Sequence, residues 1–373
     1  MSPAAAERLP HRGTRLRDRL TRVAEAATTP LLPADYLDLF APLRSGADLR
    51  GRIEEIHPET ADAATIVIRP GADWAGHVPG QYLRIGIDVD GVRLWRAYSL
   101  THGPRADGRI SVTVKAVPDG KVSNHLVHQA RPGTLVHLEQ AAGEFVLPPE
   151  GGKFLFVTAG SGITPVIGML RNLFPATDEG VVRLPRSEAF DITVLHVAPS
   201  APDSIFAANL RELADGGAIE LVARYDDEHG GLDLADLERL VPDVGARATY
   251  ACGPAGLLDA LAAHHDERGL PLFVEQFRTG TRVVGEGGTL TCSRSGTVVE
   301  ADGATPLLDV AEDAGVLMPS GCRMGVCFGC VLPLREGSVR DLRNGEITTA
   351  EPDDNVSIQT CVNAAAGPVD LDV

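Results

Sequence analysis

The chain has 373 residues, of which 44% are hydrophobic and 23% charged, and 34 basic against 51 acidic residues give a net charge of −17. This length exceeds that of one ordinary domain, so we expect two or three domains. The composition excludes a disordered or fibrous protein. The net charge argues against nucleic acid as a partner, because the phosphate backbone would be repelled.

Residues 1–46 form a basic extension ahead of the domains. Apolar residues at helical spacing predict a short amphipathic helix over 14–26. The simpler interpretation is that this helix packs against the rest of the protein. The more specific interpretation is that it contacts an anionic membrane. The extension lacks the apolar segment of a signal peptide, and no stretch reaches the roughly 18 to 20 apolar residues that cross a bilayer. We therefore expect a cytoplasmic protein, with peripheral membrane contact as an option.

Residues 47–149 contain short runs rich in β-branched residues, separated by Gly, Pro and Asp. This pattern predicts an antiparallel β-barrel. Residues 150–279 instead alternate apolar strands with helices, which predicts a parallel sheet with crossover helices. The glycine-rich stretch 280–288 indicates a flexible linker. Residues 289–373 form a third, acidic unit with two strands and a helix before a group of cysteines.

The strongest motif lies in that third unit. Cys322, Cys327 and Cys330 follow the spacing C-x4-C-x2-C, and Cys361 comes thirty-one positions later. Clustered cysteines in a reducing compartment indicate metal ligation before disulfides. This spacing is typical of thiolates that hold a plant-type 2Fe-2S cluster. Structural zinc is the minor alternative, because zinc ribbons prefer two C-x2-C pairs.

The middle unit carries glycines at the turn between its first strand and first helix, in residues 158–165 (TAGSGITP). Glycines at such a turn let a pyrophosphate approach backbone N–H groups at the positive end of a helix. A second turn, Cys252-Gly253-Pro254, follows a later strand at the edge where ligands bind in open α/β sheets. In the barrel, Arg96-Ala-Tyr98-Ser99 offers a guanidinium for phosphate and a ring for a flat cofactor.

Taken together, these motifs resemble the ferredoxin-NADP reductase superfamily, fused to a C-terminal plant-type 2Fe-2S ferredoxin domain. The resemblance implies an FAD-binding β-barrel over 47–149, an NAD(P)H-binding α/β domain over 150–279 and a β-grasp-like α+β ferredoxin domain over 289–373. It also implies an NAD(P)H-dependent oxidoreductase whose cofactors are FAD, a 2Fe-2S cluster and NADPH or NADH.

The resemblance carries over to individual residues. It assigns catalytic positions to Tyr98, Ser99 and Cys252, and cluster ligation to the four cysteines named above. The residues expected to bind FAD or the nucleotide are Gln81, Tyr82, Arg96, Tyr98, Ser99, Val114, Lys115, Gly120, Val122, Ser123, Thr158, Gly160, Gly162, Thr164, Pro165, Arg224, Cys252, Gly253, Pro254 and Phe277.

Simpler interpretations exist for several of these residues. Cys252 could be a small buried residue, Phe277 a core aromatic and Ser123 a helix cap. The choice of nucleotide also stays open. Arg224, with Ser200, could bind the 2′-phosphate of NADPH, whereas Asp203 could bind the unphosphorylated ribose of NADH.

The expected function is hydride transfer from NAD(P)H to FAD, followed by delivery of single electrons through the 2Fe-2S cluster to a partner metalloenzyme. The extension, with its segment DYLDLF at 35–40, resembles actinobacterial reductases that serve acyl-CoA desaturases, so we expect a membrane di-iron desaturase as the partner. The alternative partner is a ring-hydroxylating or steroid oxygenase. From another class, the chain could be a flavin and iron-sulfur redox sensor.

Overall fold

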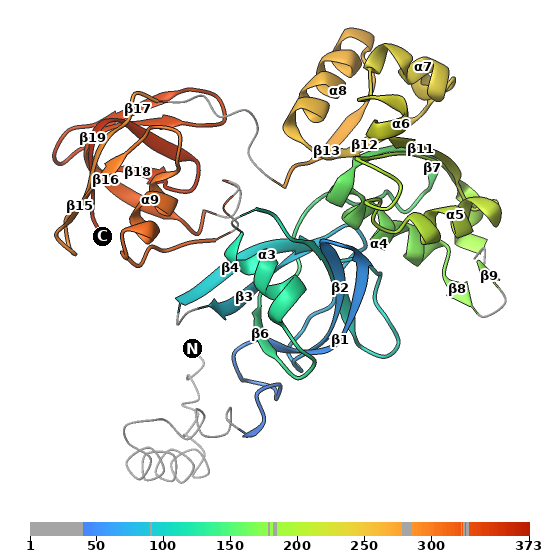
Figure 1. Cartoon of the computed structure of the whole chain (residues 1–373), viewed down its shortest axis with the longest axis horizontal. Coiled ribbons are helices and arrows are strands. Elements are labelled where there is room, and N and C mark those ends of the chain that lie inside the picture. The colour runs from blue at the N-terminus through green and yellow to red at the C-terminus, as the bar shows by residue number, and fades with distance from the viewer. Residues whose placement is uncertain are drawn as a thin grey trace, which may run out of the picture.

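The computed structural model describes residues 40–373 except 90–91, 119, 178–179, 182–184, 278–284, 322, 324 and 326–327. Along the chain, an antiparallel sheet, a parallel sheet and a mixed sheet follow one another, as the sequence predicts (Figure 1). The helix predicted over 14–26 lies outside the described residues.

The first unit is an antiparallel barrel of six strands. They are β1 (Arg50–Thr60), β2 (Ala63–Pro70), β3 (Tyr82–Val89), β4 (Val92–Ser99), β5 (Ile110–Lys115) and β6 (Leu135–Leu138). The hydrogen-bonded order is β4-β3-β6-β1-β2-β5, and a bridge between Leu100 and Val112 joins the two edges. Helix α3 (Lys121–Asn124) and a π-helical turn (His125–Gln129) connect β5 to β6. The sequence did not reveal β6, because four residues are too few to show alternation.

The second unit is a five-stranded parallel sheet with helices on both faces. Its strands are β7 (Gly152–Ala159), β10 (Phe190–Ala198), β11 (Glu220–Tyr225), β12 (Ala248–Cys252) and β13 (Leu272–Glu275), in the order β11-β10-β7-β12-β13. Its helices are α4 (Ile163–Leu173), α5 (Ala207–Asp215), α6 (Asp226–His229), α7 (Leu237–Leu240) and α8 (Ala255–Arg268). Smaller elements are the hairpin β8 (Ala176–Thr177) and β9 (Gly180–Val181), and 3₁₀ turns at Gly160–Gly162, Pro185–Ala189, Leu234–Asp236 and Val244–Ala246.

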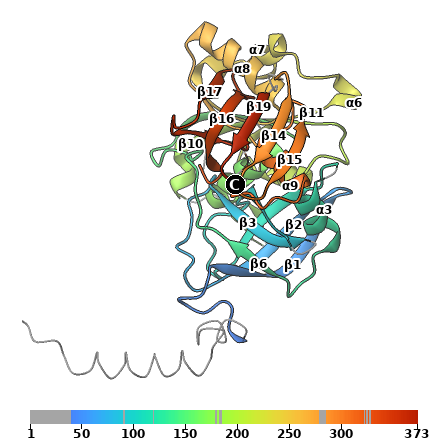
Figure 2. The same cartoon turned by 90° about the vertical axis from the view of Figure 1, so that its left-hand side faces the viewer.

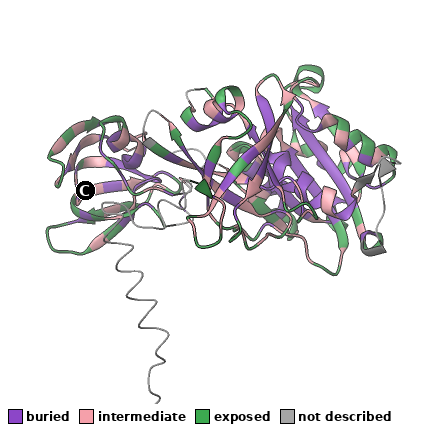
Figure 3. Cartoon of the chain, turned by 90° about the horizontal axis from the view of Figure 1, so that it is seen from below, coloured by how far each residue is buried: buried purple, intermediate pink, exposed green. Residues whose placement is uncertain are grey.

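Helices α4 and α5 pack on one face of this sheet, and α7 and α8 pack on the other. The central strands are buried on both faces, which explains their continuous apolar runs (Figure 3). Helix α5 begins directly after Phe206, which has a left-handed backbone with φ of 61°. Residues 234–240 form a 3₁₀ turn followed by the short α7.

The third unit is a mixed sheet with one helix. Its elements are β14 (Gly288–Cys292), β15 (Thr297–Ala301), α9 (Leu307–Asp313), β16 (Val331–Asp341), β17 (Ile347–Ala350), β18 (Val356–Gln359) and β19 (Asn363–Leu371). Strand β14 runs parallel to β19 and antiparallel to β15, while β16 pairs antiparallel with β17, β18 and β19. The strand pair and helix predicted before the cysteines are therefore confirmed.

The predicted linker is wrong for its last residues. Gly285 N donates to Gly303 O at 2.7 Å and Gly287 N donates to Ala365 O at 3.2 Å, while Gly288 already belongs to β14. A Cβ at Gly288 would lie 2.0 Å from Gly367 O, so glycine serves close packing there instead of flexibility. Residues 280–284 lie outside the described residues. The exact domain limits stay predictions.

The barrel contacts both other units. In Figure 1 the parallel sheet lies to its right and the mixed sheet to its left, and Figure 2 shows the mixed sheet above the β3 side of the barrel. Hydrogen bonds from Ser99 to Glu275 and from Arg84 to Ser320 join the barrel to the second and third units respectively. This arrangement places the edge formed by β3 and β4 between the other two sheets.

Candidate functional site

Four neighbouring strands of the parallel sheet, β10, β7, β12 and β13, carry polar side chains that lie beside one another in the strand register. His196 pairs with Thr158, Thr158 with Cys252, and Cys252 with Glu275 in the strand register. Directly paired residues of a parallel sheet point to the same face. Thr158 Oγ1 lies 2.8 Å from His196 Nδ1, and burial lowers the pKa of His196 to about 4, so the imidazole is neutral at pH 7. The row therefore forms one uncharged polar line across the sheet.

The barrel completes this row at its Glu275 end. Ser99 Oγ, at the end of β4, donates to Glu275 Oε2 at 3.5 Å. Burial raises the pKa of Glu275 to about 8, while the hydrogen bond from Ser99 acts in the opposite direction. Burial and the nearby Glu275 raise the pKa of the Cys252 thiol, which is fully buried. Near pH 7 the site therefore holds few charged groups and is largely shielded from water. Both properties suit hydride transfer.

Glu275 is a site residue that the sequence analysis missed. It appeared only as a neighbour of Phe277, since one carboxylate at the end of a strand carries no recognisable spacing. Its signal was its place as the last residue of the last strand, at the same sheet edge as Cys252. Ligands bind at this edge of α/β sheets.

The glycine turn has the expected geometry. Residues 160–162 form a 3₁₀ turn that leads directly into α4, and Gly160 has a positive φ of 53°. A Cβ at Gly162 would lie 2.0 Å from Cys252 O, so only glycine fits between the two predicted nucleotide-binding turns. Thr164 Oγ1 donates to Ser161 O at 2.9 Å, and Pro165 occupies the first turn of α4. The structure thus brings the two turns together.

Arg96 and Tyr98 lie on β4, opposite Ile85 and Leu83 of β3. Arg96 Nη1 donates to Trp95 O at 2.8 Å, and within the described chain no second hydrogen bond of this guanidinium is found. Burial is the main cause that lowers the pKa of Arg96, and burial also raises the pKa of Tyr98. A half-buried guanidinium with unused donors fits a pyrophosphate, and a half-buried ring on the same strand fits a flat cofactor.

Gln81 and Tyr82 lie at the start of β3 beside the same edge. Gln81 Oε1 accepts from Val78 N at 2.9 Å, and its Nε2 donates to Gly143 O at 3.2 Å. A Cβ at Gly143 would lie 3.1 Å from the Tyr82 ring. These contacts fix the loop that begins β3.

Four predicted flavin contacts have structural roles of their own. Val114 and Val122 are buried in the barrel core, so a contact with FAD could come only from their backbone. Lys115 Nζ pairs with Asp62 at 2.9 Å. Ser123 Oγ donates to Gly120 O at 3.2 Å and accepts from Val117 N at 3.3 Å, but Ser123 lies within α3 and the N-cap is Gly120, so the helix-cap interpretation is wrong.

The residues predicted to choose between NADPH and NADH lie around neighbouring strand ends. Arg224 is buried at the end of β11 and donates through Nη2 to His229 O at 3.2 Å, while its buried Nε has no partner among the described residues. Ser200 Oγ donates to Asp203 Oδ2 at 2.6 Å. Asp227 N donates to Pro199 O at 3.1 Å, which joins the two loops.

Two further predicted residues border the Cys252 strand. Gly253 lies against Ala159, where a Cβ would meet the side chain at 3.2 Å, and Pro254 precedes α8 as its N-cap. Phe277 is half-buried and packs against the apolar core between α4, α5 and the sheet. This packing agrees with the core interpretation of Phe277, and its contact with a flavin stays a prediction.

The cysteine site is partly described. Cys322 and Cys327 lie outside the described residues. Cys330 and Cys361 are buried, and their sulfurs lie 3.1 Å apart without a disulfide. The hydrogen bond with Cys361 is the largest cause that lowers the pKa of Cys330 to about 6. Two converging sulfurs, one of them an easily ionised thiol, fit thiolate ligands of one metal centre.

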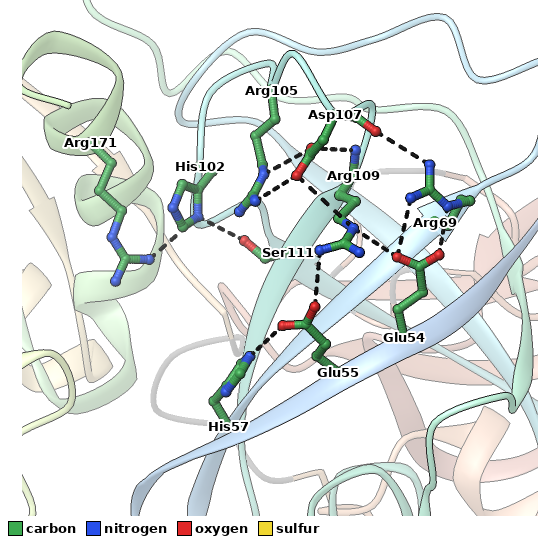
Figure 4. Close-up of polar contacts among 10 residues, drawn as sticks. All are labelled: Glu54, Glu55, His57, Arg69, His102, Arg105, Asp107, Arg109, Ser111 and Arg171. Carbon is green, nitrogen blue, oxygen red and sulfur yellow. Dashed lines mark hydrogen bonds and ion pairs between the residues drawn. The ribbon is translucent and has the colours of Figure 1, made fainter. Parts of the chain in front are cut away.

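A polar network fastens the parallel sheet to the barrel on the side of α4. Arg171 Nη1 donates to Thr101 O at 3.2 Å and lies 3.5 Å from His102 Nδ1, which lies 2.9 Å from Ser111 Oγ (Figure 4). Burial lowers the pKa of His102 to about 3, so it faces Arg171 as a neutral acceptor. A second group of ion pairs lies beside it on the barrel and consists of Glu54, Glu55, His57, Arg69, Arg105, Asp107 and Arg109.

Apolar and backbone packing tightens the same boundary. A Cβ at Gly168 in α4 would lie 2.3 Å from Leu100 O. Tyr250 OH donates to Val146 O at 3.1 Å, and the rings of Tyr250 and Phe145 meet edge to face with centroids 5.3 Å apart. The hydride-transfer candidate site therefore lies at a closely packed boundary.

Comparisons with known proteins identify the families of the first and third units. Residues 54–147 match the family described as an oxidoreductase FAD-binding domain, and residues 290–365 match the 2Fe-2S iron-sulfur cluster binding domain. An NADPH oxidoreductase of Mycobacterium tuberculosis is 47% identical over 363 residues, which covers 95% of this chain and 92% of that protein. The chain belongs to this oxidoreductase family.

Two more distant relatives have the same organisation. The ferredoxin reductase component of a 3-ketosteroid-9-alpha-monooxygenase from Mycolicibacterium smegmatis is 29% identical over 77% of this chain and 86% of that protein. The solved structure of phthalate dioxygenase reductase matches with a TM-score of 0.57 and 23% identity over 87% of this chain and 98% of that one. The latter supports the fold alone.

The chain is accordingly an NAD(P)H-dependent oxidoreductase of FAD and 2Fe-2S type. The 2Fe-2S prediction is thereby confirmed over the zinc alternative. The described part of this oxidoreductase contains no helix that is long and apolar enough to span a membrane.

Proposed function

We propose that this oxidoreductase takes hydride from NADPH at the junction of Ser99, Cys252 and Glu275 and supplies single electrons to a membrane di-iron acyl-CoA desaturase. The observation that carries the hydride step is the junction itself, where residues of the barrel and of two sheet strands meet in a buried site. Bound FAD accepts a hydride and a 2Fe-2S cluster carries one electron at a time, so the two together convert a two-electron donor into a one-electron supply.

The chain's own residues bind, orient and exclude water. The glycine turn and the N-terminus of α4 take the pyrophosphate of the nucleotide, and Cys252 lies beside its nicotinamide. Arg96 would hold the flavin phosphates, and Tyr98 would pack on the flavin ring. Ser99, whose hydroxyl contacts Glu275 in this structure, would lie at the ring edge, and Glu275 keeps its proton near pH 7 because burial raises its pKa to about 8. The resemblance to the reductase superfamily suggests these roles, and the positions of Arg96, Tyr98 and Ser99 along one strand are consistent with them.

NADPH is the proposed donor on the strength of the relative that matches most of the chain. That NADPH oxidoreductase is 47% identical to this chain, and the match covers 95% of the chain's 373 residues. Fewer than 46 residues are left unmatched, so the match includes part of the segment that precedes the barrel. Arg224, with its unpartnered Nε, is the proposed partner of the 2′-phosphate. Exchange of Arg224 for Leu should raise the KM for NADPH while leaving the KM for NADH nearly unchanged.

The desaturase proposal is supported by the extension before the barrel. The 95% match to the NADPH oxidoreductase includes part of that extension, whereas the reductase components of steroid and glycine betaine monooxygenases match between 76% and 79% of the chain. The second candidate partner is an oxygenase, favoured by the names of those reductase components, which serve steroid and glycine betaine monooxygenases. Contact of residues 1–46 with the membrane is part of the first proposal.

The first experiment is an anaerobic absorption spectrum of the purified protein before and after equal additions of NADPH and NADH. Bleaching of both the flavin and the iron-sulfur bands, faster with NADPH, is the expected result. Bleaching with NADH alone would overturn the donor assignment. Bleaching of the flavin bands alone would separate the two centres and contradict the proposed electron path.

The partner is tested by reconstitution. The protein is added, with NADPH, either to membranes that contain a stearoyl-type desaturase or to a purified steroid oxygenase component. Formation of the double bond supports the desaturase proposal, and product from the oxygenase alone would replace it with the second candidate. Slow NADPH-dependent reduction of cytochrome c, without product from either, would favour the redox sensor.

A further inference from the structure

Arg84 of the barrel reaches the third unit next to the predicted cluster ligands. Its Nη2 donates to Ser320 O at 3.2 Å, across 236 positions of sequence. Ser320 comes two residues before the predicted ligand Cys322. The Arg84 side chain is only 11% exposed, so this hydrogen bond is protected from water. The contact joins the barrel's flavin side to the segment that carries the cysteines.

Two neighbouring side chains fix the orientation of the Arg84 guanidinium. Nη1 pairs with Glu139 Oε2 at 2.8 Å, and the guanidinium lies over the Trp95 ring at 5.3 Å from its centroid. Trp95 in turn covers Gly86, where a Cβ would approach the ring to 2.8 Å. An arginine fixed on two sides loses little further freedom when it binds a third group. The barrel therefore presents a preoriented donor to Ser320.

Complementary charges lie at the same boundary. Arg323 pairs with Asp309 and Glu312 of α9 at 2.6 Å each. The pKa of barrel Arg96 is lowered by burial first and by Arg323 next, and is raised by Asp309 and Glu312, so all four charges lie within reach of one another. Arg323 of the third unit and the two acids that pair with it therefore lie near Arg96 of the barrel.

We propose that Arg84 is a positioning residue that holds the cysteine-bearing segment against the barrel and so sets the rate of electron transfer between the two bound cofactors. The inference rests on the proposed ligand role of the cysteines. Electron transfer slows steeply as the distance between two centres grows, whereas hydride transfer depends on the Ser99 junction. Loss of the Arg84 contact should therefore slow the first process without changing the second.

The test compares three variants of the full-length holoprotein by stopped-flow absorption with NADPH. Arg84→Met keeps the stem that packs on Trp95 but removes the donors. Arg84→Lys keeps the charge, yet a single ammonium cannot bind Glu139 and Ser320 in the same bidentate manner. Arg93→Met is the matched control, since Arg93 lies on neighbouring β4 and pairs with Asp88 on the same sheet.

In Arg84→Met, reduction of the flavin should keep the wild-type rate. The following bleaching of the iron-sulfur bands should become several-fold slower, because the cysteine-bearing segment then lies farther from the barrel on average. Arg84→Lys should fall between Arg84→Met and the wild type, and Arg93→Met should match the wild type in both steps.

A second readout does not depend on turnover. Backbone hydrogen exchange of a peptide covering residues 316–323 should become faster in the oxidised Arg84→Met protein and stay unchanged in Arg93→Met. Wild-type rates of iron-sulfur bleaching and of exchange in Arg84→Met would overturn the inference, and an equal loss of flavin reduction would assign Arg84 to the flavin site instead. If NADPH fails to bleach the iron-sulfur bands of the wild type itself, the proposed function is wrong as well.

Discussion

The barrel's two boundaries differ in how they are built. Toward the parallel sheet it is closely packed, with Gly168 against Leu100, Tyr250 against Val146 and the Arg171 network around His102. Toward the third unit the described contacts are polar, with the hydrogen bond from Arg84 to Ser320 and the charges around Arg323. One boundary is a shared core and the other is a docking contact.

The difference matches the chemistry assigned to each boundary. Hydride transfer needs reacting atoms in van der Waals contact and a site without water, which close packing provides. Transfer of a single electron tolerates a gap, so a polar and separable contact is sufficient. Beside the predicted ligands, Phe328 is 68% exposed.

The largest expected effect comes from removing one of the predicted cluster ligands. Cys330→Ser should abolish the iron-sulfur absorption and reduce NADPH-dependent cytochrome c reduction by at least about 100-fold, since even changes around a metal ligand can cost 10- to 100-fold. Flavin reduction by NADPH should persist, because the hydride never reaches the cysteines. Cys292→Ala is the control, since Cys292 is equally buried in the same unit. Loss of flavin reduction in Cys330→Ser would contradict the separation of the two boundaries.

A smaller effect is expected from disturbing the packed boundary. Gly168→Ala places a Cβ 2.3 Å from Leu100 O, so α4 must move away from the barrel. Hydride transfer should slow by about 10-fold, as expected for a displacement near 1 Å. Gly256→Ala in α8 serves as the control, because a Cβ there meets nothing within 4 Å. Stopped-flow flavin reduction measures both, and equal rates would show that the boundary tolerates displacement.

Glu275 predicts a pH dependence of stability at the packed boundary. Its pKa rises from 4.5 to about 8 in the folded chain, so between these values the unfolded carboxyl is ionised while the folded one keeps its proton. The free energy of unfolding should therefore fall as pH rises through this window, by at most about 1.4 kcal/mol per pH unit, and level off above pH 8.

Glu275→Gln should remove this contribution, and the difference between wild type and variant in the unfolding midpoint, followed from pH 5 to 9, isolates it. Glu267→Gln is the control, because that side chain is 76% exposed. A midpoint difference that does not change with pH would show that Glu275 is ionised in the folded protein.

The smallest effect concerns salt. Raising the ionic strength from about 0.05 to 0.5 M shortens the screening length to a few Å and weakens the attraction between Arg96 and the acids of α9. Iron-sulfur bleaching should slow by about twofold, as expected for partly exposed charges. Flavin reduction, measured under saturating NADPH, should not change. A larger salt effect on the rate of flavin reduction than on the rate of iron-sulfur bleaching would show that charges matter more at the boundary with the parallel sheet than at the boundary with the third unit.

Much of the molecule could be predicted from local patterns. The change from period-two runs to alternating strands and helices indicated the barrel and the parallel sheet, and the spacing of Cys322, Cys327, Cys330 and Cys361 indicated the 2Fe-2S domain. Such signals are visible because the residues that carry them are close in sequence. The prediction was wrong for the end of the linker, where Gly287 and Gly288 pair with distant backbone.

The sequence by itself determined the three units, their order and the cofactor classes, because hydrophobic period, glycine turns and cysteine spacing are properties of short segments. Tertiary structure alone decided that Glu275 meets Ser99 across 176 positions, that Arg84 meets Ser320 across 236, and that the side chains of Val114 and Val122 lie in the barrel core. These contacts depend on strand register and on how separately folded units pack, and neither is encoded in a local pattern.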